Sequence, residues 1–286
     1  MQIWHMGRTV LPEYANGERP VAPSKVKADG EIRGRDGRKR PFVTPRAMTI
    51  PEIKETVADF ARAAERAVEA GVDGIEIHGA NNFLIDSFLR DGTNRREDEY
   101  GGPVENRNRF LIEVVAAVTG AIGAGKVGVR LSPTNSYFGI TDSKPDITFP
   151  GAAAMLNDFD LAYLHVLESK PAGDMAPVSH LIRAAYKGTL IKNGGYDHHS
   201  GNEALDAGEA DAIAFGVPFI ANPDLVERYR YGLPLTDSDP ETYYTPGWRG
   251  YTDYASPMMT PKLLPGGFSL RDETRATGET IDRKAA

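Results

Sequence analysis

The stretch GVDGIEIHGANNFLID, from Gly71 to Asp86, decides the fold. Its centre, GIEIH, is a short apolar run rich in β-branched residues and bounded by glycines, which is typical of a buried strand. A loop follows at once and carries an imidazole, His78, and an amide, Asn81, three residues apart. The pattern therefore predicts polar groups at the point where the chain leaves a sheet.

The segment before this strand predicts a long helix. Thr49 and Glu52 have the spacing of a capping box, in which each side chain bonds the other's backbone. Gly71 is suited to end the helix because it tolerates a left-handed conformation. The residues between them that repeat at helical spacing are Ile53, Val57, Phe60, Ala64 and Val68.

Strands and helices alternate through most of the chain. A helix is expected at 104–118, with Phe110, Val114 and Val118 on one face. The other strands are predicted at 2–6, 126–133, 161–166, 188–195 and 211–216, and the other helices at 151–157, 179–186, 198–207 and 222–231. The last helix begins with Asn222-Pro223, which fits a cap followed by a first turn.

This alternation indicates a parallel sheet of the α/β class. Polar residues or glycines follow the strands, as the C-terminal face of a (β/α) barrel requires. Only six strands are found, whereas a closed barrel has eight. The pattern favours the barrel, but six strands also suit a doubly wound open sheet.

Composition limits the classes of function. The chain has 286 residues with 41% hydrophobic and 26% charged, enough for one large core. A net charge of −7 gives no basic surface for nucleic acid or an anionic membrane, so small molecules are the expected partners. There is no cysteine, which excludes disulfides and thiolate chemistry and fits a reducing cytoplasm. No apolar run is long enough to span a membrane, and no metal site is expected.

Several motifs in order resemble the Old Yellow Enzyme family of flavin-dependent ene reductases (NADH:flavin oxidoreductases). They are QIWHMGR (2–8), TPRAMTIPEI (44–53), the run 71–110, VGVRLSP (127–133), NGGYD (193–197) and AFGVPFIANPDL (214–225). The resemblance extends to about Tyr254. It implies a TIM-type (β/α)₈ barrel that binds FMN and passes hydride from NAD(P)H through the flavin to activated alkenes, quinones or nitro compounds.

The chain begins inside a strand, and the resemblance offers an explanation. In the family, QIWH is similar to the third barrel strand, so the first two βα units would precede Met1. We therefore expect an N-terminally shortened, incomplete barrel forming one FMN-binding domain over 1–286. Residues 9–45 are expected to form an excursion loop, and a tail is expected from about 255.

The resemblance assigns roles around the substrate. His78 and Asn81 match the pair that donates hydrogen bonds to the substrate's carbonyl or nitro oxygen; the alternative is a strand-end histidine and an asparagine that caps backbone. Phe83 stands where the family has the tyrosine that delivers a proton, so it is expected only to pack. Tyr251 matches a tyrosine of the substrate pocket, although a surface aromatic is almost as plausible from sequence.

The resemblance also assigns the cofactor contacts. Arg130 and Gln2 match residues at the flavin pyrimidine edge; for Arg130 the alternative is a salt bridge at the barrel mouth. The phosphate is expected at glycine-rich loops after two late strands, where backbone N–H groups can approach it. Those positions are Gly194, Gly195, Gly216 and Val217, the last replacing the family's arginine.

Three hypotheses follow. The first is an FMN-dependent NAD(P)H oxidoreductase of the Old Yellow Enzyme type, impaired by its substitutions and its short length. The second is a non-catalytic remnant with weak or no flavin binding. The third, a barrel enzyme such as a phosphosugar lyase, requires a lysine or paired carboxylates at strand ends, and only Lys192 and Glu168 qualify. The natural substrate, the choice between NADH and NADPH, and the oligomeric state stay open.

Overall fold

The computed structural model describes residues 1–168 and 176–256. Contacts divide the chain into two compact units, Met1–Ala214 and Phe215–Ala286, which are described in turn. Of the expected tail, everything after residue 256 lies outside the described residues. No helix in the described ranges is long and apolar enough to cross a membrane.

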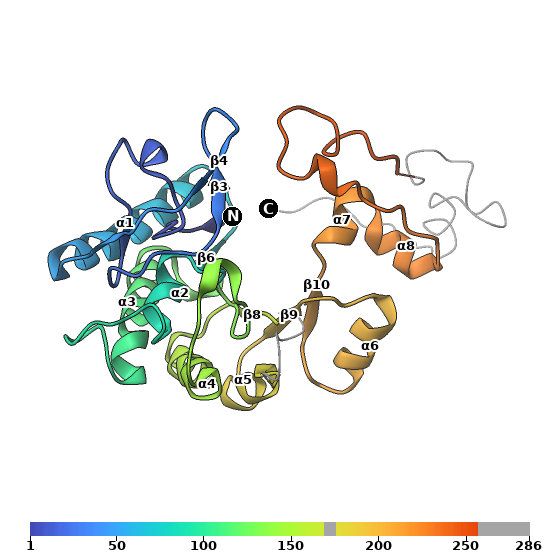
Figure 1. The fold of residues 1–286 in the computed structure, drawn as a ribbon. Coiled ribbons are helices and arrows are strands. Elements are labelled where there is room, and N and C mark those ends of the chain that lie inside the picture. Colours follow the sequence, from blue (N-terminus) through green and yellow to red (C-terminus); the bar gives the residue numbers. More distant parts are fainter. Residues whose placement is uncertain (169–175, 257–286) are drawn as a thin grey trace. The chain divides into compact units, whose positions relative to one another are not determined.

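The first unit is built on a parallel sheet of six strands (Figure 1). In spatial order these are β1 (Gln2–Ile3), β6 (Ile75–Gly79), β7 (Val127–Leu131), β8 (Tyr163–Leu167), β9 (Leu190–Asn193) and β10 (Ala212–Ala214). Each strand is added on the same side of the previous one, without the reversal of order that defines a doubly wound sheet. The winding is that of a (β/α) barrel with six of its eight strands. The barrel prediction is confirmed, and the open-sheet alternative is wrong.

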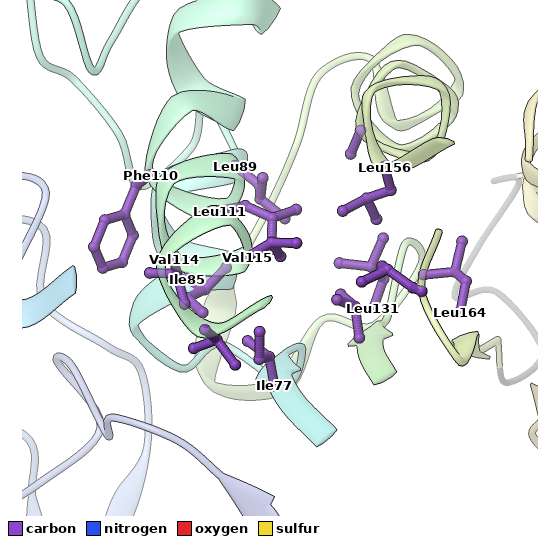
Figure 2. Close-up of a cluster of buried hydrophobic side chains, with 14 of the residues drawn as sticks. Ile77, Ile85, Leu89, Phe110, Leu111, Val114, Val115, Leu131, Leu156 and Leu164 are labelled. Carbon is purple, nitrogen blue, oxygen red and sulfur yellow. The ribbon is translucent and has the colours of Figure 1, made fainter. Parts of the chain in front are cut away.

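Helices connect the strands and bury one face of the sheet. They are α1 (Ile50–Glu69), α2 (Leu84–Leu89), α3 (Val104–Ile122), α4 (Pro145–Leu156), α5 (Ser179–Ala185) and α6 (His198–Asp206). Figure 2 shows part of the resulting core, in which side chains of α2, α3 and α4 gather with Ile77, Leu131 and Leu164 of the strands. Phe110, Val114 and Val118 of α3 are fully buried, as their spacing predicts.

The other face of the sheet, inside the barrel, is polar. Strand side chains alternate between faces, so the buried Ile75 and Ile77 leave Glu76 and His78 on the inner side. The register aligns His78 with Arg130 of β7, and Arg130 with His165 of β8. A layer of charged and hydrogen-bonding side chains therefore lies on the inner face of the sheet, near the carboxyl ends of the strands.

The predicted helix ends are confirmed where a capping signal exists. In α1 the Thr49 hydroxyl accepts from the Glu52 N–H at 3.4 Å, and Glu52 Oε2 accepts from the Thr49 N–H at 2.8 Å. Gly71 follows with φ +90° and donates to Val68. The predicted spans of α5 and α6 are correct to within one residue.

Two predicted helix starts are wrong. The helix expected at 151–157 begins at Pro145, and Pro150 lies inside it because the apolar positions around it continue the helical spacing. The helix expected at 222–231 begins at Leu225. Asn222 is not its cap: its amide is fully buried and bonds the backbone of Pro218 and Thr236.

The segment 9–45 contains regular structure of its own. After the turn η1 (Pro12–Tyr14), β2 (Val21–Ala22) pairs with β5 (Arg46–Ala47), and β3 (Glu31–Arg33) forms a hairpin with β4 (Lys39–Pro41). The second unit contains α7 (Val217–Ala221), α8 (Leu225–Tyr231) and the turn η5 (Pro240–Thr242). In it, Asp224 and Arg228 form a buried ion pair at 2.8 Å.

Candidate active site

His78 is held as a neutral hydrogen-bond donor at the end of β6. Its side chain is almost fully buried, and Nδ1 accepts from the Ala80 N–H at 3.2 Å. Burial is the main cause that lowers the pKa of His78 to about 4, and the nearby Arg130 cation is the second. The imidazole is therefore neutral at pH 7 and carries its proton on Nε2, because Nδ1 is used as an acceptor.

Asn81 is fixed to the loop after β7 by both its backbone and its side chain. Its N–H donates to Ser132 Oγ at 2.9 Å, and its Oδ1 accepts from Asn135 Nδ2 at 2.6 Å. Asn81 has φ +59°, a left-handed conformation that asparagine tolerates better than most residues. Since Oδ1 is occupied, the Nδ2 group is the part of Asn81 that remains to donate.

Phe83 packs against the imidazole. Its ring lies edge-on to His78, with centroids 4.7 Å apart and planes at 84°, and it also lies 6.4 Å from the Trp4 ring. The ring has no proton to donate. The expectation that Phe83 packs agrees with these contacts.

Arg130 is a half-buried cation on the inner face of the sheet. Its Nη2 donates to Asn193 Oδ1 at 3.4 Å, and Asn193 in turn donates to the Ala214 carbonyl at 2.6 Å. Burial lowers the pKa of Arg130, and the Glu76 carboxylate opposes that effect. No carboxylate in the described part of the chain lies within 4 Å of the guanidinium, so the salt-bridge alternative finds no support there.

Gln2, predicted at the flavin, belongs to a polar network with Glu76 and His165, two residues that were not predicted. Glu76 Oε1 accepts from Gln2 Nε2 at 2.6 Å, and Oε2 lies 2.9 Å from His165 Nδ1. Burial opposes ionisation of Glu76, but the hydrogen bonds from His165 and Gln2 outweigh it and lower the pKa. Burial and this carboxylate raise the pKa of Tyr163 to about 12. Glu76 itself, a charge within a strand, was a sequence signal that could have revealed this network.

The model of the NADH:flavin oxidoreductase / NADH oxidase family matches residues 1–236. The chain belongs to this family.

Two relatives and one solved structure match this chain over most of its length. It is 41% identical over 270 residues to 12-oxophytodienoate reductase 2 of Arabidopsis thaliana, covering 89% of this chain and 70% of the relative. It is 43% identical over 260 residues to putative 12-oxophytodienoate reductase 11 of Oryza sativa, covering 88% and 71%. The solved old yellow enzyme homologue from Zymomonas mobilis superposes with a TM-score of 0.86 at 45% identity, covering 89% and 72%. The resemblance to the Old Yellow Enzyme family is confirmed.

The inner face of this family member suits an FMN isoalloxazine ring. The half-buried Arg130 guanidinium has no carboxylate partner among the described residues and can stabilise an electron-rich ring edge. At the end of β9, Gly194 and Gly195 have φ +128° and +75°. A Cβ added to Gly195 would meet open space, so its backbone is accessible to a ligand.

Three predicted positions belong to the second unit of this oxidoreductase. Gly216 is the N-cap of α7 and has open space at its Cα. Val217 is the first residue of α7 and is exposed. Tyr251 is 54% exposed and its N–H donates to the Trp248 carbonyl. Their predicted roles remain predictions.

Lys192 and Glu168, the basis of the lyase hypothesis, have structural partners. Lys192 Nζ pairs with Glu209 at 2.8 Å, and Glu168 accepts from the N–H groups of Val178 and Ser179 at the start of α5. Each thus has a structural partner of its own, and the family membership overturns this hypothesis.

Proposed function

We propose that the chain is an FMN-dependent NAD(P)H oxidoreductase that reduces an activated alkene, quinone or nitro compound. The observation that carries the proposal is the pair of neutral donors, His78 Nε2 and Asn81 Nδ2, at the carboxyl ends of barrel strands beside Arg130. Family membership supplies the cofactor class. A morphinone reductase solved in complex with tetrahydroNAD, 43% identical to this chain, supports NAD(P)H as the reductant.

Bound FMN supplies hydride transfer. His78 and Asn81 hold the substrate oxygen, on which negative charge grows as hydride reaches the conjugated carbon. Two fixed donors stabilise that charge as an oxyanion hole does, and losing one such donor typically costs about 10²–10³-fold in rate. Because the pKa of His78 is about 4, its donor form persists through neutral and mildly acidic pH.

The cofactor contacts are proposed from the family match and from local geometry. Arg130 and Gln2 would face the pyrimidine edge of the ring, and Arg130 would stabilise its reduced, negative form. Backbone N–H groups of Gly194, Gly195 and Gly216 would bind the phosphate. Val217 would add no charged contact there, and Tyr251 would line the substrate pocket.

We further propose that Phe83 narrows the range of good substrates. An enone needs a proton at the carbon next to its carbonyl, and general-acid catalysis of such steps is typically worth about 10²–10⁴-fold. Quinones and nitro groups take protons from solvent on oxygen.

The absence of cysteine supports a cytoplasmic location.

The test uses the purified chain supplied with FMN under anaerobic conditions. We expect NADH or NADPH to bleach the flavin absorbance, and a quinone to restore it faster than a cyclic enone does. His78→Ala and Asn81→Ala should slow the quinone step and leave bleaching by NAD(P)H largely unchanged. Flavin that binds but is never bleached, or substitutions without effect, would contradict the proposal.

A further inference from the structure

Asn135 joins Asn81 to the backbone of the loop after β7. Its Oδ1 accepts from the Tyr137 N–H at 2.8 Å, and its Nδ2 donates to Asn81 Oδ1 at 2.6 Å. The two asparagines come from different loops, 54 residues apart in sequence.

These contacts fix which end of each amide faces which partner. A backbone N–H can only donate, so the Asn135 atom beside Tyr137 N must be the oxygen. The other end of Asn135 is then an NH₂ group, and the Asn81 atom that accepts from it must also be an oxygen. Asn81 therefore presents its own NH₂ group away from Asn135.

We propose that Asn135 is a positioning residue that sets Asn81 as a donor to the substrate oxygen. The inference rests on the proposed role of Asn81. Without Asn135, rotation of the Asn81 amide by 180° would place Oδ1 where the donor belongs. Two oxygens would then face each other, and the substrate oxygen would lose one of its two hydrogen bonds.

The loop that carries Asn135 is held rigidly enough to act in this way. Arg90, nearly fully buried, donates through Nη1 to the carbonyls of Pro133 at 3.3 Å and Asn135 at 3.1 Å, and through Nη2 to that of Ser132. Ser132 Oγ in turn accepts from the Asn81 N–H at 2.9 Å. Asn135 and the Asn81 backbone are thus both held to the loop after β7, which Arg90 fixes in place.

A phenol reports the polarity of Asn81 without turnover. Its ionised oxygen only accepts hydrogen bonds, whereas its neutral hydroxyl can also donate. An NH₂ group at the site favours the phenolate and lowers the pKa of the bound phenol, and a carbonyl oxygen favours the neutral form. The probe is 4-cyanophenol, titrated by absorbance from low to high pH on the full chain, with and without added FMN.

Three substitutions give different expected results. Asn81→Ala removes the donor and should weaken phenolate binding about tenfold or more. Asn135→Leu introduces no charge, frees the Asn81 amide to rotate, and should raise the pKa of the bound phenol towards that of Asn81→Ala. An aspartate at position 135 can only accept, so Asn135→Asp should turn the Asn81 amide around and raise the pKa of the bound phenol further. Each unit of that pKa corresponds to a tenfold change in the affinity for phenolate relative to phenol.

Asn157 provides a matched control in the first unit. It has the same kind of contacts, with Oδ1 accepting from the Lys187 N–H and Nδ2 donating to the Ala185 carbonyl. It lies after α4, just before β8 begins, so it is at the opposite end of the strands from Asn81. Asn157→Asp should leave the pKa of the bound phenol unchanged.

The outcomes separate the two proposals. If Asn81→Ala weakens phenolate binding but Asn135→Leu leaves the pKa of the bound phenol at its wild-type value, the role of Asn135 is overturned and that of Asn81 stands. If Asn135→Leu weakens phenol and phenolate equally, Asn135 is only structural and the inference also fails. If Asn81→Ala has no effect, or the wild-type chain binds neither form, the proposed function itself fails.

Discussion

The ring of Phe83 lies edge-on to His78 at 4.7 Å, on the same loop as Asn81. We expect Phe83→Tyr to raise the rate of enone reduction by about 10²-fold or more, because the added hydroxyl supplies a general acid. Bleaching of the flavin by NAD(P)H should hardly change. Stopped-flow measurements of the two half-reactions test this separately.

Phe83→Leu is the matched control for that substitution. It removes the ring that packs on His78 without adding an acid, so both enone and quinone reduction should fall if the ring orients the imidazole. Equal enone rates for phenylalanine and tyrosine at position 83 would show that another proton source serves the site.

His78 should make the stability of the chain depend on pH. Its pKa is about 4 in the folded chain, against an ordinary value of 6.5. Between these values the unfolded chain binds a proton that the folded chain does not, so stability falls as the pH falls from 6.5 to 4. We expect His78→Gln to remove this part of the pH dependence, by up to about 3 kcal/mol. Urea unfolding at pH 7 and pH 4.5 measures it, and an NMR titration of the imidazole with a midpoint above pH 6 would contradict it.

At the scale of single residues, the sequence identifies the groups but not their orientation. His78, Asn81 and Arg130 were predicted because they follow strand signals in a recognisable family string. Asn135 and Glu76 were missed because their importance comes from contacts with Asn81 and His165 across loops and strands. The spacing of residues along the chain does not predict such contacts.

At the scale of elements, α2 depends on a buried ion pair. The helix has six residues, too few to be stable alone in water. Asp86 in the helix pairs at 2.7 Å with Arg90, the residue directly after it, and the two side chains are 0% and 3% exposed. Asp86 also accepts from the Asn82 N–H. Arg90→Met should therefore destabilise the chain by about 3–5 kcal/mol, because it leaves a buried carboxylate without its cation, and one carboxylate oxygen and several loop carbonyls without a donor.

Arg62 of α1 is the matched control for Arg90. It also pairs with carboxylates, Asp59 and Glu55, but on an exposed surface. Exposed pairs contribute little to stability, so Arg62→Met should unfold at nearly the wild-type urea concentration. Equal midpoints for the two variants would mean that water replaces the contacts of Arg90.

Helix ends were predictable where the signal was local and failed where tertiary contacts decided. The Thr49–Glu52 capping box needs only its own residues, and it marks the start of α1 correctly. Asn222-Pro223 has the same outward form of a helix start. The side-chain amide of Asn222 instead donates to the carbonyls of Pro218 and Thr236, and α8 begins at Leu225.

At the scale of the whole molecule, the order of strands followed from the alternation of elements, but their environment did not. Parallel sheets are normally covered on both faces, and a closed barrel has no edge strand. Within the described residues, β1 has only β6 as a neighbour and β10 only β9. The three residues of β10 are all partly exposed, whereas four of the five residues of β7 are buried.

These edges are expected to cause self-association. Unpaired backbone groups on β1 and β10 can accept a strand from another chain, and doing so would also cover the half-exposed Ile213. Sedimentation velocity over a range of concentrations should therefore show dimers or larger species that dissociate on dilution. Ile213→Lys should shift the distribution towards monomer, because a charge at the edge opposes strand pairing. Val226→Lys, an equivalent change at an exposed position of α8, should not. A chain that remains monomeric at high concentration and unfolds in one sharp transition would show that the edges are protected.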